Sequence, residues 1–135
     1  MENQKTAIII DDDSEILESF SLFLKRFNVN VVATAFDGLK ANDLYRKHKP
    51  DVVFLDLIMP KQDGFVTCKK LKDEFPDAKI IVITAHLDVE VTEKLVRLQP
   101  FGILPKPFDT HKAMLLIQRL NLAKALDPIK SIQIS

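Results

Sequence analysis

Short, uninterrupted apolar runs recur along the 135-residue chain and constrain its fold more than any other feature. The three clearest runs cover residues 7–10, 52–55 and 80–83, and all are rich in β-branched residues. Each is too short for a helix, and continuous rather than alternating apolar residues are typical of strands covered on both faces, as in a parallel sheet. Weaker runs at residues 31–35 and 103–104 predict two more strands, and Pro105 favours an edge position for the last.

Amphipathic stretches separate these runs and predict helices. The first helix presents one apolar face, made of Ile16, Phe20, Phe23, Leu24 and Phe27. Asp13 or Ser14 can cap the start of this helix. Further helices are predicted over residues 39–48, 64–75, about 91–98 and about 109–126, with Asp127 and Pro128 ending the last. Five successive strand–helix units predict an α/β fold, a doubly wound five-stranded parallel sheet with helices on both faces.

Composition limits the classes of function. The chain has 19 basic and 19 acidic residues, and a net charge of zero argues against bulk attraction to nucleic acid or to an anionic membrane. No apolar run approaches the ~20 residues of a membrane span. The one cysteine, Cys68, excludes an intramolecular disulfide, favours a cytoplasmic location and is expected in the core. Residues 5–126 are expected to form one domain, and residues 127–135 a C-terminal tail or linker stub.

Polar residues follow the predicted strands at the points where they end. In an open parallel sheet, ligands bind beyond the carboxyl ends of the strands. The residues at these ends are Asp11, Asp12, Asp13, Asp56, Thr84, Ala85 and Lys106. Any one of them alone has an ordinary explanation as a turn former, a helix cap or a surface group. Their joint placement at four strand ends favours a functional site.

Charge repulsion indicates what such a site would bind. Two carboxylates about 4 Å apart repel by roughly 4 kcal/mol at an effective dielectric constant near 20, so a cluster of three needs a counter-charge. Donors that are all oxygen atoms favour Mg²⁺, and Lys106 adds a second positive charge. A metal, an ammonium and a hydroxyl around one carboxylate form a site that can transfer a phosphoryl group to that carboxylate.

Four sequence blocks resemble the receiver domain of two-component response regulators. They are IIIDDD at residues 8–13, PDVVFLDLIMP at residues 50–60 with Asp63–Gly64 after it, ITA at residues 83–85 and KPF at residues 106–108. The resemblance spans about residues 5–126. It implies a flavodoxin-like sheet with strand order 2-1-3-4-5.

The resemblance also implies roles for the residues at the strand ends. Asp56 would be the phosphoacceptor. Asp12, Asp56 and the backbone carbonyl of Ile58 would bind Mg²⁺ directly, and Asp11 would hold it through water. Lys106 would pair with the phosphoryl oxygens, Thr84 would move to hydrogen-bond them, and Ala85 would be small enough to admit them. The Lys106–Pro107 peptide is expected to be cis, and Asp13 fits helix capping better than metal binding.

Some positions depart from the family pattern. Ile103 stands where the family often has a switching Tyr or Phe, and its aliphatic side chain has no ring to reorient. Gln99 and Pro100 replace a usual Gly-Ala, so the chain entering the fifth strand is expected to run differently. Ile58 and His86 occupy positions that tune dephosphorylation in the family. Ile58 is apolar and cannot orient an attacking water, so we expect it to make the aspartyl phosphate long-lived. His86 could orient a water or could simply lie in solvent.

The implied partners are a sensor histidine kinase or a histidine phosphotransfer protein, and an output domain or protein outside this chain. A homodimer stays open, no nucleic acid or membrane is expected to bind, and the domain is expected to promote only its own phosphotransfer and dephosphorylation rather than to act as an enzyme.

Two alternatives remain open. One is a small haloacid dehalogenase-like phosphohydrolase with Asp11 as nucleophile and Asp13 as acid/base. Glu15 opposes it because that family usually has Thr or Val there. The other is a receiver fold that binds partners without phosphorylation, which is disfavoured because the set of acidic residues, Thr84 and Lys106 is complete.

Overall fold

Five parallel strands form one sheet in the order β2-β1-β3-β4-β5, which confirms the predicted topology. The computed structural model describes residues 4–59 and 62–134, so Pro60 of the block at residues 50–60 lies outside the described part. The strands are β1 (Lys5–Ile10), β2 (Val29–Ala35), β3 (Val52–Asp56), β4 (Ile80–Thr84) and β5 (Gly102–Pro105). β5 lies at an edge, as Pro105 predicted, because an edge strand has a side without partners.

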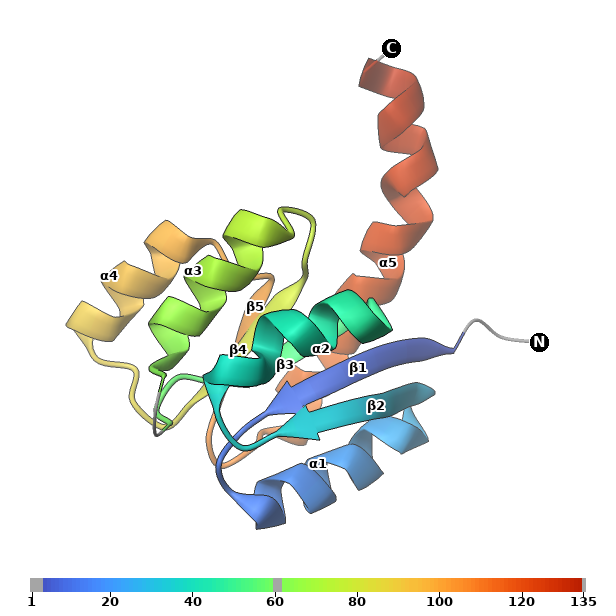
Figure 1. Ribbon diagram of the computed structural model, residues 1–135. Helices are drawn as coiled ribbons and strands as arrows, with labels where there is room; N and C mark the ends of the chain where they lie inside the picture. The colour runs from blue at the N-terminus through green and yellow to red at the C-terminus, as the bar shows by residue number, and fades with distance from the viewer. Residues whose placement is uncertain (1–3, 60–61, 135) are drawn as a thin grey trace.

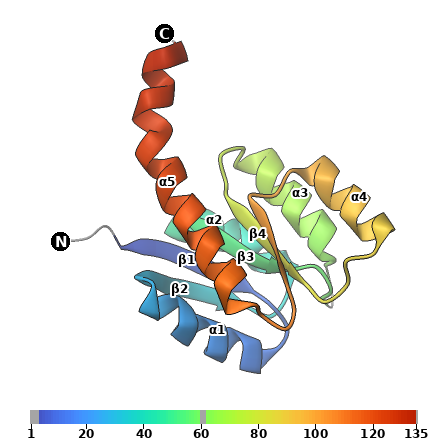
Figure 2. The same cartoon turned by 180° about the vertical axis from the view of Figure 1, so that it is seen from behind.

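Helices cover both faces of the sheet (Figures 1 and 2). They are α1 (Ser14–Arg26), α2 (Ala41–His48), α3 (Gly64–Glu74), α4 (Val89–Leu98) and α5 (Thr110–Ile134). α1 and α5 pack on one face, and α2, α3 and α4 pack on the other. A 3₁₀ turn (Gly38–Lys40) precedes α2, so the predicted helix over residues 39–48 is divided in two. Within the described residues, none of the helices has the length and apolar character that spanning a membrane requires.

The core consists of two layers, one on each face of the sheet. In β1, Ala7 and Ile9 pack towards α1 and α5, whereas Ile8 and Ile10 pack towards α2, α3 and α4. All four side chains are 0% exposed. Successive side chains of a strand point to opposite faces, so burial on both faces requires an apolar residue at every position. The uninterrupted apolar runs in the sequence therefore follow directly from this layering.

The apolar face of α1 is rotated slightly from the predicted one. Leu17, Phe20 and Leu24 are buried, whereas Ile16 is half-buried. Phe27 lies just past the helix and is 36% exposed. The prediction missed Leu17, which lies three residues before Phe20, because it started the face at Ile16, four residues before Phe20. Spacings of three and of four both fit the helical period, so the periodicity alone does not choose between these two positions.

The end predicted for the last helix is wrong. α5 continues through Asp127 and Pro128 to Ile134, and its last turns project away from the sheet in both views (Figures 1 and 2). A proline inside a helix removes one hydrogen bond and costs about 3 kcal/mol relative to alanine. The residue types before it (Ala123, Lys124, Ala125 and Leu126) are strong helix formers. The proline thus removes one donor without ending the helix.

α3 begins against the backbone of β3. The Asp63 carboxylate caps the helix by accepting hydrogen bonds from the N–H groups of Phe65 and Val66 at 2.7 and 3.3 Å. The N–H of Gly64 donates to the carbonyl of Leu57 at 2.8 Å. A Cβ atom on Gly64 would lie within 3 Å of backbone atoms of Leu57 and Asp56. Glycine at this position therefore lets α3 approach the end of β3.

The thiol of Cys68 lies fully buried on α3, as predicted. Burial raises the pKa of this thiol to about 11. Because the thiolate is the reactive form, Cys68 is an inert core residue.

We expect Gly64→Ala to lower the free energy of unfolding by about 1–3 kcal/mol, because the added methyl group meets backbone atoms that cannot rotate away. Urea denaturation checks this value. Gly102→Ala is the matched control, because its methyl group would meet only the end of the Leu116 side chain, which can move. An equal loss of stability in both variants would contradict the close approach of α3 to β3.

Candidate functional site

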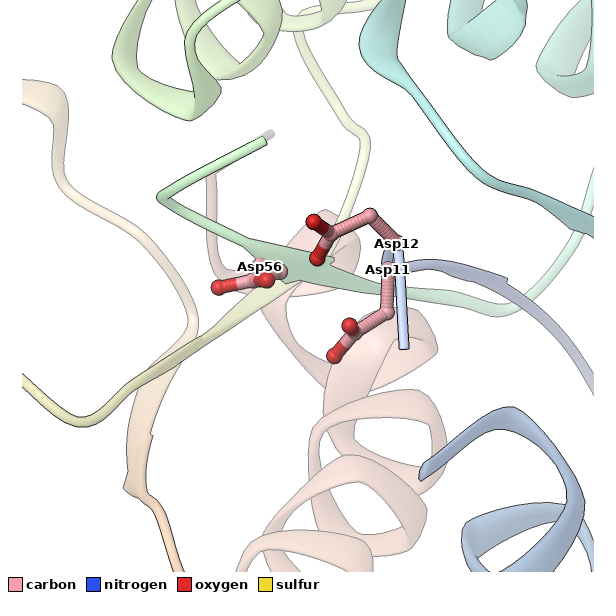
Figure 3. A group of neighbouring side chains, drawn as sticks. All are labelled: Asp11, Asp12 and Asp56. Atoms are coloured by element: carbon pink, nitrogen blue, oxygen red, sulfur yellow. The ribbon is translucent and has the colours of Figure 1, made fainter. Parts of the chain in front are cut away.

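Three carboxylates meet at the carboxyl end of the sheet. Asp11 and Asp12 follow β1, and Asp56 is the last residue of the adjacent β3. One oxygen from each carboxylate lies within 4.8 Å of the others, and Figure 3 shows the three side chains gathered at this edge. Asp11 is fully buried and Asp56 is 5% exposed, whereas Asp12 is exposed to solvent. The parallel register of β1 and β3 brings together residues that are about 45 positions apart in the sequence.

Lys106 supplies the opposite charge. Its Nζ atom lies 2.9 Å from Oδ2 of Asp11 and 3.3 Å from Oδ2 of Asp56. Its backbone N–H donates to the carbonyl of Thr84 at 2.9 Å, which fixes the start of this loop to the end of β4. The Lys106–Pro107 peptide is cis, as expected.

Electrostatics at the site make Asp56 harder to ionise than a free aspartate. Burial, followed by repulsion from the Asp11 carboxylate, raises the pKa of Asp56 from 3.8 to about 6. The ammonium of Lys106 and the N–H of Ile58 act in the opposite direction but do not outweigh these two effects. Burial lowers the pKa of Lys106, yet its ion pairs with Asp11 and Asp56 more than offset this, so that pKa is raised. The site therefore holds more negative charge than one lysine balances.

The oxygen donors left at the site suit a divalent cation. Oδ1 of Asp11 accepts a hydrogen bond from the N–H of Asp13 at 2.9 Å. Oδ2 of Asp11 is buried and has the Lys106 ion pair, but no well-aligned hydrogen-bond donor among the described residues. Three carboxylates and one ammonium leave a formal charge near −2, and all the donors are oxygen atoms, which hard cations such as Mg²⁺ prefer. The residues present therefore fit such an ion.

Thr84 ends β4, the strand next to β3. Its side chain is buried, and its Oγ1 atom accepts a hydrogen bond from the N–H of His86 at 3.0 Å. Ala85 and His86 are exposed beyond it. The predicted hydroxyl group thus lies at the expected strand end, held in a local turn.

Two aliphatic residues occupy the positions that depart from the family pattern. Ile58 follows β3 and is 59% exposed at the rim of the site. Ile103 is half-buried in β5 and packs against the core layer on the side of α2, α3 and α4. Gln99 ends α4 in the left-handed conformation with a φ of 52°, which glycine adopts more easily. The chain thus enters β5 from a left-handed turn despite the missing glycine.

Comparison with known proteins identifies the family. A model of the response regulator receiver domain matches residues 7–118. The chain belongs to this family. Its function is that of a receiver domain of two-component response regulators.

Two curated relatives of the receiver domain are longer proteins. The oxygen regulatory protein NreC of Staphylococcus aureus is 34% identical over 113 residues, which are 82% of this chain and 52% of NreC. The probable C4-dicarboxylate response regulator DctR of Priestia megaterium is 27% identical over 130 residues, which are 96% of this chain and 53% of DctR. The chain thus spans about half the length of these two relatives.

Solved structures confirm the fold. The chemotaxis protein CheY4 of Vibrio cholerae superposes with a TM-score of 0.79 at 25% identity, covering 87% of this chain and 99% of that one. The receiver domain of a modulated diguanylate cyclase from Desulfovibrio desulfuricans gives a TM-score of 0.82 at 24% identity, covering 93% and 99%.

The phosphohydrolase alternative is not supported. The matched family is a different one, and Asp13 is not among the three acids of the carboxylate cluster. Instead, its carboxylate caps α1 by accepting hydrogen bonds from the N–H groups of Glu15 and Ile16 at 2.9 and 3.4 Å. This cap is the role that the sequence favoured for Asp13.

Sequence reasoning missed two groups that hold the loops of the receiver site. Phe108 stacks on Phe20 of α1 with ring centres 4.3 Å apart, which ties the loop after Lys106 to the core. Gln62 is buried and donates hydrogen bonds to the carbonyl of Gly38 at 3.2 Å and to Oγ1 of Thr67 at 2.9 Å. The position of Phe108 directly after Lys106–Pro107 was a usable signal, whereas a single glutamine in a loop gives none.

We expect Asp56→Asn to stabilise the receiver domain without metal at neutral pH. The folded-state pKa lies above the unfolded one, so ionising Asp56 costs stability as pH rises from about 4 to 6. This pKa shift corresponds to a cost of roughly 3 kcal/mol, which solvent at the open edge reduces. We therefore expect Asp56→Asn to raise the free energy of unfolding by about 1–2 kcal/mol. Denaturation at several pH values measures the gain, which should fade below pH ~4. Glu18→Gln, on the exposed side of α1, is the control; a gain for Asp56→Asn that is independent of pH would contradict the origin in charge.

Proposed function

We propose that Asp56 accepts a phosphoryl group from a phosphohistidine of a sensor kinase or a phosphotransfer protein. The observation that carries this proposal is the Lys106 ammonium, which contacts the Asp11 and Asp56 carboxylates at 2.9 and 3.3 Å. Among the clustered acids, Asp56 is largely buried but still reached by solvent, so one oxygen can meet a donor. Family membership supports the same assignment.

The carboxylates supply a site for Mg²⁺. Asp12, Asp56 and the backbone carbonyl of Ile58 would hold the ion directly, and Asp11 would hold it through water. When bound, the ion would neutralise charge on the phosphoryl oxygens. Oxygen donors within 4.8 Å of one another and the excess negative charge support this assignment.

The proposed phosphoryl transfer is a displacement at phosphorus. An Asp56 carboxylate oxygen forms the new O–P bond while the P–N bond to the imidazole breaks, and the imidazole nitrogen keeps the electron pair and is then protonated. Asp56 reacts as the carboxylate, which Lys106 stabilises by its positive charge. The product carries a charge of about −2 near neutral pH, close to Lys106 and to the end of β4.

This added charge is the proposed switch. The Thr84 hydroxyl would leave its turn with His86 to hydrogen-bond the phosphoryl group, and exposed Ala85 leaves room for it. The movement would bias the arrangement of α4 and β5. Because Ile103 has no ring to reorient, packing of an aliphatic side chain would replace aromatic rotation there.

We propose that the domain acts as a signalling phosphoacceptor rather than as a turnover enzyme, and that it works in the cytoplasm. Residues 5–126 would form the receiver unit, and residues 127–135 would lead to an output domain or protein. The greater length of NreC and DctR supports such an output.

Incubation with Mg²⁺ and acetyl phosphate should label Asp56. Borohydride trapping followed by mass spectrometry locates the modified residue. Asp56→Asn should abolish the label, whereas Asp13→Asn, which removes a charge outside the carboxylate cluster and keeps a capping oxygen, should keep it. Label on Asp11, or normal labelling of the Asp56→Asn variant, would refute the assignment.

Ile58→Asn should shorten the lifetime of the aspartyl phosphate several-fold. Ile58 lies 59% exposed beside the acceptor, and an amide there can orient an attacking water that an aliphatic side chain cannot. The decay rate of labelled protein measures the effect. Leu22→Asn, at an exposed position of α1, is the matched control, and an unchanged or slower decay of Ile58→Asn would count against this role.

A further inference from the structure

A groove of about 280 Å³ lies between α3 and α4, away from the carboxylate cluster. The two helices run side by side on the same face of the sheet in both views (Figures 1 and 2). The groove is lined by Phe65, Val66, Lys69, Lys94, Arg97 and Leu98. None of these lining residues is acidic.

The floor of the groove is apolar and open to solvent. Phe65 and Leu98 are half-buried, and Val66 is 46% exposed. An exposed apolar surface of this kind gains free energy when a partner covers it, at roughly 25 cal/mol per Å².

The rim of the groove is cationic. The Nζ atom of Lys94 lies 5.2 Å from the centre of the Phe65 ring. Lys69 and Lys94 pair with Asp73 and Glu90 of their own helices at 3.0 and 3.8 Å. Exposed pairs of this type contribute at most about 1 kcal/mol, so a partner's carboxylates can replace them.

Arg97 is the most available cation of this rim. No carboxylate of the described residues lies within ion-pair distance of its guanidinium group. Its planar group can bind a carboxylate through two parallel hydrogen bonds.

We propose that this groove binds an amphipathic helix of a partner protein, with apolar residues on one face and Asp or Glu along its edges. Apolar side chains would fill the floor, and the acidic edges would meet Lys69, Lys94 and Arg97. The lining residues span five positions of α3 and five of α4, about 7 Å along each helix, so the groove contacts between one and two turns of a partner helix.

The chemistry of the groove disfavours other occupants. A second copy related by two-fold symmetry would place the same cationic rim against itself. The C-terminal part of α5 belongs to a helix on the opposite face of the sheet, and residues 127–135 contain one acid and one base. A nucleic acid would leave the apolar floor uncovered.

The groove connects to the phosphoacceptor through the start of α3. Phe65 and Val66 follow Gly64, whose N–H donates to the carbonyl of Leu57, the residue after Asp56. The groove is distinct from the α4–β5 side that the proposed switch uses. Its binding of a partner helix does not rest on the phosphorylation of Asp56.

A fluorescent synthetic peptide tests the proposal. The peptide forms an amphipathic helix of about four turns, with leucines on one face and glutamates along its edges; its counterpart carries lysine for every glutamate. We expect the acidic peptide to bind with a Kd in the micromolar range, and the basic one about tenfold or more weakly, by anisotropy. Amide shifts in ¹⁵N spectra should map to α3 and α4.

Variants with matched controls decide whether the groove is the binding site. Val66→Asp and Arg97→Glu should each raise the Kd of the acidic peptide about tenfold. Val89→Asp, at a position that is 74% exposed on α4 outside the groove, and Arg26→Glu on α1 should leave its affinity unchanged. Arg97→Glu should also gain affinity for the basic peptide, which a merely unfolded variant would not do.

Three results would each overturn the proposal that this groove binds an acidic helix. They are absence of binding, equal binding of the two peptides, and full affinity in Val66→Asp and Arg97→Glu. Amide shifts confined to other faces would do the same. A wild-type dimer in sedimentation that Val66→Asp dissociates would show that the occupant is a second copy instead.

Discussion

The site depends on a single lysine that balances carboxylates which the sheet forces together. The register of β1 and β3 places Asp11 and Asp56 side by side, one fully buried and the other nearly so. At an effective dielectric constant near 20, two such charges repel by roughly 3–4 kcal/mol. Lys106 contacts both, and its loop is held by the N–H bond to Thr84 and by the stacking of Phe108 on Phe20. The position of one ammonium therefore offsets part of the repulsion between these two carboxylates.

The charge balance at this edge is incomplete, because one ammonium faces three carboxylates. Burial, followed by repulsion from the Asp11 carboxylate, raises the pKa of Asp56, so its negative charge is costly in the folded chain. The two-layered apolar core supplies the stability that offsets this local cost. Because the repulsion is concentrated at one edge, a change of charge at Asp56 alters the energy of the loops around it more than that of the core. A domain that responds to a phosphoryl group needs this separation between a stable core and a strained edge.

Most of the fold was predictable because burial on both faces requires uninterrupted apolar runs, and the residues that follow those runs lie at the carboxyl edge. Asp11, Asp56 and Lys106 were identified in this way, and the structure brings them together. The exact apolar face of α1 was harder to predict, because Ile16 and Leu17 lie four and three residues before Phe20 and both spacings fit a helical face. The continuation of α5 past Pro128 was missed because a proline removes one hydrogen bond without fixing the conformation of the residues after it. The role of Gln62 depends on contacts with Gly38 and Thr67 that no local pattern encodes.

The site is tied more tightly to some of the surrounding elements than to others. Phe108 links the Lys106 loop to α1 on one face, and Gly64 links the end of β3 to α3 on the other. Along β5, the aliphatic Ile103 offers no ring that could alternate between a buried and an exposed position. By contrast, Gly64 leaves no space between α3 and the backbone of Asp56 and Leu57, so a displacement of that backbone must move the start of α3. In this receiver domain, the start of α3 is therefore tied directly to the backbone of Asp56, the proposed phosphoacceptor.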